Sequence, residues 1–417
     1  MSLYVMKFGG SSVGDTERMK RVAKRIAEKQ DEGHQCVVVV SAMGDTTDEL
    51  IDQSKLLNEN PPAREMDMLM VNGEQISMAL LSMAIHNLGR DAISFTGWQA
   101  GFRTEAVHGK ARITDIHPER VKKALGEGKI VIVAGFQGMT DEGEITTLGR
   151  GGSDTTAVAL AAAIDADFCE IYTDVDGIYS TDPRIVKNAR KLKEISYDEM
   201  LELANLGAAV LHPRAVEYAK HSGVPLIVRS SFNYNEGTVV KEEAVMEQGV
   251  VVSGIAYDKN VARISILGVA DHPGVLARVF GSLAAHQIDV DIIVQSGGQN
   301  GEADFSFTVG LSDRERAIEV LNKTRDELPF RDITFEDNLV KVSIVGAGMV
   351  SHPGVAAQMF DVISDQGVNI KMVSTSEIKV SCVIEGGKLQ EVIRALHTAY
   401  NLDTEEQAFV GGPETRR

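Results

Sequence analysis

The sequence has few cysteines and no pattern that would build a disulfide framework or a zinc site. Its three cysteines, Cys36, Cys169 and Cys382, lie far apart in apolar segments. An odd and scattered set of this kind indicates buried, reduced thiols. The ten histidines show no H-E-x-x-H spacing, which excludes a zinc hydrolase site of that type.

Long apolar runs and an excess of positive charge are also missing. No uninterrupted apolar stretch approaches the ~18 residues that a membrane-spanning helix needs, and the first residues have no basic or apolar leader pattern. The chain has 60 Asp and Glu residues against 42 Lys and Arg, a formal net charge of −18. Such a surface repels nucleic acids and anionic membranes. We therefore expect a cytoplasmic protein that binds neither.

What is present is the composition of a globular protein with more than one domain. At 417 residues the chain exceeds one ordinary core, and 43 % of it is hydrophobic. Up to about residue 230, apolar runs typical of buried strands alternate with helical patterns, and this alternation predicts a parallel sheet covered by helices on both faces. The expected strands are 3–8, 36–40, 130–134, 170–173 and 225–229, and the expected helices are 16–30, 64–87, 155–166 and 197–206.

The C-terminal part contains an internal repeat. Residues 230–237 are polar and residues 242–248 are acidic and loosely patterned, so 231–249 is the expected linker. Beyond them the box His-Pro-Gly-Val occurs at 272–275 and again at 352–355, each time between a strand pattern and a helical pattern. A four-residue box repeated in the same frame predicts duplication of a small α/β unit. Each box would present helix N-terminal amides to a carboxylate, although a plain Pro-Gly turn is the alternative.

Two glycine-containing segments in the N-terminal half suit anion binding. Lys7-Phe8-Gly9-Gly10 stands at a strand-to-helix junction, where backbone amides and a lysine would hold an anion. An ordinary βα turn is the alternative, and no Walker A motif occurs anywhere in the chain. In 149–154, Gly-Arg-Gly-Gly-Ser-Asp, the arginine suits bidentate recognition of a carboxylate or phosphate. For Ser153 and Asp154 the alternative is helix N-capping.

Further candidates follow the predicted strands. Thr173-Asp174 ends a predicted parallel strand, at the edge where open α/β sheets bind ligands, although the Asp-Gly and Asp-Pro pairs beyond it also form turns. Ser41 and Thr47 lie in a hydroxyl-rich stretch after a run of valines. Glu74 is a carboxylate in an apolar helical region, and a solvated helix charge is its alternative.

In this order the motifs resemble the aspartate kinases of the amino-acid-kinase fold, and the repeated units resemble ACT domains. The resemblance covers essentially the whole chain. It implies an α/β protein with an N-terminal parallel-sheet sandwich (1–230), a linker (231–249), and two βαββαβ ACT-type units (250–335 and 336–417), with residues 250–257 pairing with the second unit. The implied reaction is phosphorylation of L-aspartate by ATP, the first step of lysine, threonine and methionine biosynthesis. Mg²⁺ would be held mainly by the ATP phosphates, with no metal site in the protein.

The resemblance also implies roles for individual residues. Lys7 and Asp154 would be catalytic. ATP would contact Lys7, Phe8, Gly9, Gly10, Thr173, Asp174, Tyr179, Asp182 and Arg184, with either Arg190 or Lys191 on a phosphate. L-Aspartate would contact Ser41, Thr47, Glu74, Arg150, Gly151, Gly152 and Ser153. Arg150 would bind the α-carboxylate of aspartate, and Glu74 would bind its ammonium group.

For the repeated units the resemblance implies feedback inhibition by lysine, alone or jointly with threonine. The effector sites would form between the first unit of one chain and the second unit of its partner, in a homo-oligomer. Their residues would be Asp271, Pro273, Gly274, Val275, Leu276, Asp289, Asp291 and Gln295 in the first unit, and Val355, Ala356, Asn369, Ile370, Thr375 and Ser376 in the second. Some relatives also start translation internally, here near Met246, and so produce a separate regulatory subunit.

Two other functions stay open at this point. A different enzyme of the same fold would phosphorylate glutamate, acetylglutamate or a nucleotide, but such relatives generally lack the paired ACT units. A non-catalytic amino-acid sensor would have a degraded kinase half, whereas Lys7, Arg150 and Asp174 are all present.

Overall fold

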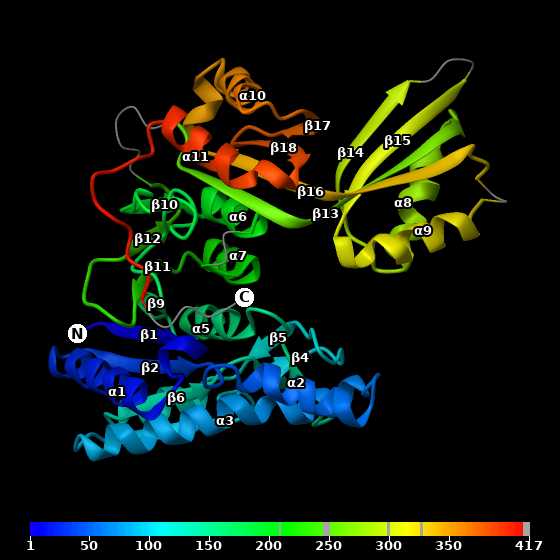
Figure 1. Cartoon of the computed structure of the whole chain (residues 1–417). Helices are drawn as coiled ribbons and strands as arrows, with labels where there is room; N and C mark the ends of the chain where they lie inside the picture. The colour runs from blue at the N-terminus through cyan, green and yellow to red at the C-terminus, as the bar shows by residue number, and fades with distance from the viewer. Residues whose placement is uncertain (208–209, 245–250, 298–300, 326–327, 412–417) are drawn as a thin grey trace.

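The computed structural model describes residues 1–207, 210–244, 251–297, 301–325 and 328–411. Figure 1 shows an N-terminal domain, coloured blue to green, with the second C-terminal unit stacked against it and the first C-terminal unit, in yellow, standing to one side. Part of the expected linker forms a strand of the N-terminal domain, and Met246 lies outside the described residues.

The N-terminal domain is built on an eight-stranded sheet in the order β10-β12-β11-β9-β1-β2-β6-β3. Six of these strands are mutually parallel, which confirms the predicted sheet: β1 (Leu3–Phe8), β2 (Gln35–Val40), β3 (Ala92–Phe95), β6 (Ile130–Ala134), β9 (Phe168–Thr173) and β11 (Leu226–Ser230). The edge adds β12 (Thr238–Lys241), antiparallel to β11, and β10 (Glu194–Ser196).

Helices cover both faces of this sheet. Side chains of β1 and β2 alternate between two cores: Val5, Val37 and Val39 face one side, and Met6 and Phe8 face the other. The first core is completed by α4 (Glu119–Gly126), α5 (Gly152–Ala163), α6 (Tyr197–Asn205) and α7 (Pro213–Ser222), and the second by α1 (Thr16–Asp31) and α3 (Ala63–Asn87). The α2 helix (Thr46–Leu57) packs on α3. The predicted sandwich is therefore confirmed.

A second, four-stranded sheet was not predicted. Its order is β5-β4-β7-β8, and its strands are β4 (Phe102–Thr104), β5 (Ile113–Ile116), β7 (Gln137–Met139) and β8 (Ile145–Thr147). Strands of three or four residues are too short to display a period in the sequence. This sheet matters for function because β8 leads directly into the 149–154 segment.

The two C-terminal units share two long strands. β13 (Gly254–Ala270) and β16 (Asp332–Val345) run through both units of a six-stranded sheet in the order β14-β15-β13-β16-β18-β17. The remaining strands are β14 (Val290–Gly297), β15 (Glu302–Val309), β17 (Ile370–Thr375) and β18 (Lys379–Glu385). The start of β13 pairs with the part of β16 that belongs to the second unit, since Gly254 lies opposite Val345.

The repeated boxes occupy equivalent places in the two units. Gly274 and Gly354 are the N-cap residues of α8 (Val275–Ala285) and α10 (Val355–Asp365), with φ angles of 95° and 101°. Left-handed backbone of this kind favours glycine, which explains why the box keeps it. The units are completed by α9 (Arg314–Lys323) and α11 (Leu389–Ala399).

The cysteines and the long apolar helix α3 contribute buried side chains to the protein core. The three cysteines are free and buried, as predicted. Among the described residues, α3 is long and apolar enough to cross a membrane on length and composition alone. It nevertheless packs as a core helix, with Val71, Leu81 and Ile85 buried, and its apolar pattern is interrupted by Glu74.

Candidate active site

The predicted anion-binding segments meet at one edge of the main sheet. The carboxyl ends of β1, β2 and β9 lie side by side there, and the chain order reverses at β1. Open α/β sheets bind ligands at such a switch point. Short backbone contacts hold the ends together: the Ser41 N–H donates to the Phe8 carbonyl at 3.1 Å, and the Gly9 N–H donates to the Tyr172 carbonyl at 3.3 Å.

Lys7 and Asp154 form an ion pair at this edge. The Lys7 Nζ lies 2.6 Å from Asp154 Oδ1, and each side chain is only 12 % exposed. Oδ1 has no hydrogen-bond partner of good angular geometry among the described residues, so Coulomb attraction dominates this contact. The N-cap of α5 is Gly151, with φ of 69° and no side-chain cap, so the capping interpretation of Ser153 and Asp154 is wrong. The Asp154 carboxylate faces Lys7 instead.

Gly10 permits the close approach of two loops. A Cβ on Gly10 would lie 2.9 Å from the Ala42 carbonyl oxygen and 3.1 Å from the Gly44 oxygen. The Gly44 N–H donates to the Gly10 carbonyl at 3.1 Å, which fixes the Ser41–Gly44 segment against the Lys7–Gly10 motif. These two segments, which the sequence indicated separately, therefore lie against each other and form one side of the candidate site.

Glu74 on α3 is buried behind the same segment. It is 3 % exposed, and its Oε1 accepts a hydrogen bond from the Ala42 N–H at 3.2 Å. Its Oε2 has no partner among the described residues. Burial raises the pKa of Glu74 to about 7, and hydrogen bonds from its own backbone and from Ala42 oppose the rise. The alternative of a solvated helix charge is wrong. Thr47 lies in the first turn of α2.

The 149–154 segment presents Arg150 to solvent. Arg150 is exposed and makes no hydrogen bond or ion pair with the described residues, whereas Ser153 is buried. The Arg150 guanidinium is therefore free to bind an anion. The 149–154 segment leads into α5, the helix that carries Asp154. Because Asp154 is paired with Lys7, this short segment brings Arg150 to the same part of the molecule as Lys7.

Two residues behind this segment escaped the sequence analysis. His212, at the N-cap of α7, packs so closely that a Cβ on Gly151 would lie 2.1 Å from its ring. Burial lowers the pKa of His212, with Asp154 opposing and Arg214 and Arg150 adding to the effect. Asp67 is fully buried two turns before Glu74 and accepts hydrogen bonds from the His108 ring at 2.7 Å and the Thr147 hydroxyl at 2.6 Å. An acid in an apolar helix was the available signal for Asp67.

The segment 173–184 forms a polar loop beyond β9. The Asp174 carboxylate accepts from the Thr173 hydroxyl at 3.0 Å and lies 3.1 Å from the Arg184 guanidinium. The Tyr179 hydroxyl donates to Asp176 at 2.5 Å. Asp182 accepts from the Tyr257 hydroxyl, on β13, at 3.2 Å. Of the side chains predicted to contact ATP, Thr173, Asp174, Asp182 and Arg184 are thus linked to one another, while Tyr179 is held through Asp176.

Arg190 and Lys191 point in different directions. The Lys191 Nζ lies 3.3 Å from Asp176 and donates to the Glu236 carbonyl at 2.9 Å. The Arg190 guanidinium donates to the Asn401 carbonyl of the second C-terminal unit at 2.7 Å. Both residues lie beside the 173–184 loop: the Arg190 backbone N–H donates to the Ser180 hydroxyl at 2.9 Å, and the Lys191 side chain reaches Asp176.

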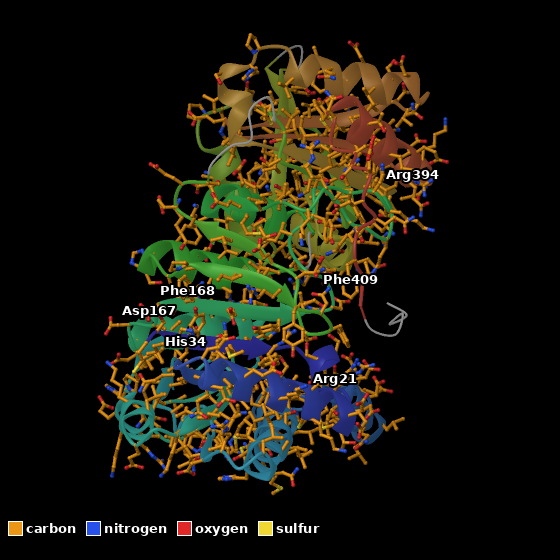
Figure 2. All side chains as sticks on the ribbon, turned by 90° about the vertical axis from the view of Figure 1, so that its left-hand side faces the viewer. Arg21, His34, Asp167, Phe168, Arg394 and Phe409 are labelled. Atoms are coloured by element: carbon orange, nitrogen blue, oxygen red, sulfur yellow. The ribbon has the colours of Figure 1, made fainter. Side chains whose placement is uncertain are left out.

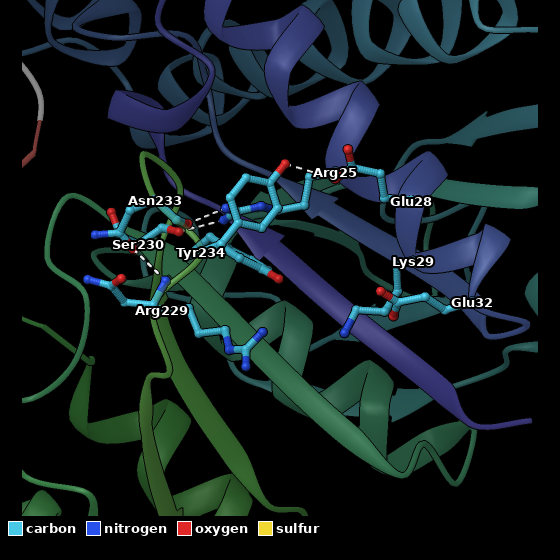
Figure 3. A pocket seen from close by; sticks show the side chains of 10 residues that line it. Arg25, Glu28, Lys29, Glu32, Arg229, Ser230, Asn233 and Tyr234 are labelled. Atoms are coloured by element: carbon cyan, nitrogen blue, oxygen red, sulfur yellow. Dashed lines mark hydrogen bonds between the residues drawn. The ribbon is translucent and has the colours of Figure 1, made fainter.

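A small cavity of about 80 Å³ lies on the α1 side of the sheet, separate from Lys7 (Figure 3). Arg25, Lys29 and Arg229 surround it. The carboxylate of the buried Glu170 offsets two of these positive charges, since it lies 3.5 Å from Lys29 and 3.6 Å from Arg229. Arg25 is held under the Tyr234 ring, 4.2 Å from the ring centroid. Lys29 and Arg229 are thus paired with Glu170, and Arg25 donates to the carbonyls of Ser230 and Asn233, so we regard the cluster as structural.

The predicted effector residues occupy corresponding places in the two C-terminal units. In the first unit, Val275 and Leu276 are the first two residues of α8, while Asp289, Asp291 and Gln295 lie on or beside β14 and are exposed. Asp271 donates its N–H to the Gly301 carbonyl at 2.8 Å. The Asp291 carboxylate is paired with Lys341. The second-unit residues, Val355, Ala356, Asn369, Ile370, Thr375 and Ser376, lie at the start of α10 and along β17.

Comparison with known families agrees with this architecture. The amino acid kinase family matches residues 2–230, and ACT domain families match residues 262–326 and 342–400. "Aspartokinase 2" of Bacillus subtilis is 56 % identical over 409 residues, which cover 98 % of this chain and 100 % of that protein.

Two solved structures of E. coli aspartokinase III resemble the chain. The complex with aspartate and ADP, in the R-state, has a TM-score of 0.81 at 27 % identity and covers 95 % of this chain and 99 % of that one. The complex with lysine and aspartate, in the T-state, has a TM-score of 0.72 at 28 % identity and covers 96 % and 99 %. The chain therefore belongs to the aspartokinases, with an amino acid kinase domain followed by two ACT domains.

Proposed function

We propose that the protein transfers the γ-phosphoryl group of ATP to the β-carboxylate of L-aspartate. A carboxylate oxygen of aspartate forms a bond to the γ-phosphorus, the bond from that phosphorus to the bridging oxygen breaks, and ADP leaves with the electron pair. The observation that carries the proposal is the Lys7–Asp154 pair, at 2.6 Å, where the parallel strands end. It holds a cation at the place where two anionic reactants would meet.

The reaction needs positive charge more than it needs a base. The side chain of aspartate has a pKa of ~3.9 and is already ionised at neutral pH. The barrier is the repulsion between this anion and the ATP phosphates, which fixed cations and backbone amides lower when they are placed in advance. Lys7, with the amides of Gly9 and Gly10, fits this role. Asp154 keeps the Lys7 ammonium in place between turnovers.

Mg²⁺ would be held mainly by the nucleotide. Among the described residues, no three His, Cys, Asp or Glu side chains gather closely enough to hold a metal ion. The donor set therefore fits an ion that arrives on the ATP phosphates and takes at most one or two protein oxygens. When bound, it neutralises phosphate charge and orients the phosphoryl group.

Aspartate would be recognised through its α-carboxylate and its α-ammonium group. Arg150 is exposed and unpaired among the described residues, which suits a bidentate contact with the α-carboxylate. Glu74 has one carboxylate oxygen without a partner, which suits the α-ammonium group. Ser41, Thr47 and the Gly151–Ser153 segment would supply the remaining contacts.

ATP would lie against the 173–184 loop. The linked side chains of Thr173, Asp174, Asp182 and Arg184 support this assignment, together with Tyr179, which is bonded to Asp176 in the same loop. Gly9 and Gly10 would approach the phosphates, whereas the predicted contact of Phe8 is limited to its backbone because its side chain is fully buried in the core. Lys191 is the better candidate for a further phosphate contact, because it faces the loop and Arg190 faces the second ACT domain.

Regulation would act through the ACT domains. We infer inhibition by lysine, alone or jointly with threonine, at sites between the first ACT domain of one copy and the second of another, in a homo-oligomer. An effector inhibits only if it binds the inactive state more tightly. Titrating lysine, with and without threonine, into the steady-state assay tests this, and unchanged activity and aspartate affinity would contradict it.

The remaining assignments rest on the family and stay proposals. They are the domain boundaries at 1–230, 231–249, 250–335 and 336–417, with β12 of the 231–249 segment belonging to the kinase-domain sheet, and a cytoplasmic location. They also include a place at the start of lysine, threonine and methionine biosynthesis, and a regulatory subunit started near Met246.

Measuring ADP release with L-aspartate, L-glutamate or no acceptor tests the activity directly. We expect release only with L-aspartate, together with an acyl phosphate that hydroxylamine traps as the hydroxamate. Equal release with glutamate would indicate another acceptor. The absence of ADP in every reaction would favour a non-catalytic sensor.

A further inference from the structure

The chain beyond α11 runs back from the second ACT domain to the kinase domain. We call Asn401–Gly411 the strap. Figure 1 shows it as the red segment that descends from α11 past β10 and β12, and Figure 2 shows its path from the helix carrying Arg394 to Phe409. Along the way the Thr404 N–H donates to the Asn188 carbonyl at 3.1 Å, and the Ala408 N–H donates to the Lys187 carbonyl at 2.8 Å.

The far end of the strap reaches the loop assigned to ATP. The Phe409 N–H donates to the Tyr179 hydroxyl oxygen at 2.9 Å, and the Gly411 N–H donates to the Asp174 carbonyl at 2.6 Å. Val410 forms an antiparallel bridge with Val175. Two residues assigned to nucleotide binding, Asp174 and Tyr179, thus accept hydrogen bonds from backbone N–H groups of the strap.

The near end of the strap is anchored in buried polar contacts. The fully buried His397 ring, on α11, lies 2.7 Å from Asp403 Oδ1 and 2.8 Å from the Ser180 hydroxyl oxygen. Burial lowers the pKa of His397, and Asp403 opposes the effect, so the neutral ring donates to Asp403 and accepts from Ser180. Ser180 belongs to the 173–184 loop. The strap is therefore tied to that loop at both ends.

These contacts also connect the loop to the second repeated box. The Tyr400 hydroxyl, at the end of α11, donates to the carbonyl of Val355, the first residue of α10, at 2.8 Å. The next residue along the chain, Asn401, begins the strap with a left-handed backbone at φ of 57°. A movement of α10 relative to α11 would therefore act at the root of the strap.

We propose that the strap is a positioning element for the nucleotide, through which the second ACT domain holds Asp174 and Tyr179 in the conformation that binds ATP. The proposal rests on the assignment of the 173–184 loop to ATP. Its physical basis is preorganisation: a loop that is already ordered loses less conformational freedom when the nucleotide binds. The Phe409 N–H also fixes the direction of the Tyr179 hydroxyl, which donates to Asp176.

The test compares two shortened chains. A chain ending at Glu405 lacks the donors Ala408, Phe409 and Gly411 but keeps Leu402 and Asp403, which pack in the second ACT domain. A chain ending at Gly411 keeps every strap contact and serves as the matched control. In the full-length protein, Phe409→Pro removes the Phe409 N–H, because proline has no backbone N–H, and Phe409→Ala, which loses the side chain but keeps that donor, is its control.

We expect the Glu405 chain to bind nucleotide about tenfold more weakly than the control, as the loss of one to two net hydrogen bonds would give. The readouts are the Kd for ADP with Mg²⁺ by calorimetry and the KM values for ATP and aspartate. The KM for ATP should rise while the KM for aspartate and the Tm stay unchanged. Phe409→Pro should shift the same two nucleotide constants in the same direction.

Equal ADP affinity in the two shortened chains would overturn the proposal. A lower Tm with both KM values raised would also overturn it, because that pattern indicates a merely structural role. The ADP measurement needs no acceptor. A wild-type protein that binds ADP but does not phosphorylate aspartate would therefore refute the proposed reaction, while the strap would still be judged on binding.

Discussion

Replacement of Glu74 by glutamine should stabilise the protein and impair its function at the same time. Glu74 is 3 % exposed, and burial raises the pKa of its carboxyl from 4.5 to about 7. This difference corresponds to about 3 kcal/mol against the ionised form in the folded state. The protonated carboxyl favours the folded state below pH 4.5, and this stability is lost as pH rises through 7. Glutamine is neutral throughout and avoids that loss.

Thermal unfolding at two pH values measures the effect. At pH 8.5 we expect Glu74→Gln to raise the Tm of the kinase domain by about 5–10 °C, the shift that about 3 kcal/mol gives in a domain of this size. Near pH 4.5 the two proteins should unfold together. Glu59→Gln, at an exposed loop position, is the matched control and should show no pH-dependent difference.

The same variant should lose recognition of the aspartate ammonium group. Removal of a charged partner costs about 100-fold in kcat/KM for aspartate, whereas the KM for ATP should stay unchanged. For the wild type, kcat/KM for aspartate should rise with pH up to about 7, as Glu74 ionises, and then level off. A Glu74→Gln protein with unchanged Tm at both pH values, or with unchanged aspartate kinetics, would refute this reasoning.

Two further predictions concern the segment at the start of α5. Arg150→Ala should lower kcat/KM for aspartate by about 10³-fold or more and leave the KM for ATP unchanged. If the wild-type enzyme phosphorylated a simple monocarboxylic acid as fast as aspartate, the role of Arg150 would be contradicted. Gly151→Ala should nearly abolish activity, because its Cβ would lie 2.1 Å from the His212 ring. Gly143→Ala shares the left-handed backbone but has nothing within 4 Å, so it should keep its activity, and equal losses in both variants would point to backbone strain alone.

Helices and strands long enough to show a regular hydrophobic spacing could be predicted from the sequence. The apolar run of β2 and the helical spacing of α1 each span several residues, and both elements end within two residues of the prediction. The repeated box located both α8 and α10. The short strands β4, β7 and β8 could not be found, because three residues carry no measurable period.

The candidate site was predicted as a set of motifs, but its internal partners were not. Lys7 and Asp154 each belonged to a recognisable motif, while their contact depends on how α5 lies on the sheet. The contact of His212 with Gly151 and the burial of Glu74 depend on tertiary packing in the same way. The strap contacts the 173–184 loop through backbone N–H groups, which every residue except proline carries. No pattern of side chains in the sequence could therefore predict these contacts.

The central claim is that fixed positive charge around Lys7 overcomes the repulsion between aspartate and ATP. Its most direct test is kcat at saturating concentrations of both substrates for Lys7→Ala, with the exposed Lys24→Ala on α1 as the control. We predict a folded Lys7→Ala protein whose kcat is lower by about 10³-fold or more, and a control with wild-type turnover. Near-normal turnover in Lys7→Ala would contradict the account.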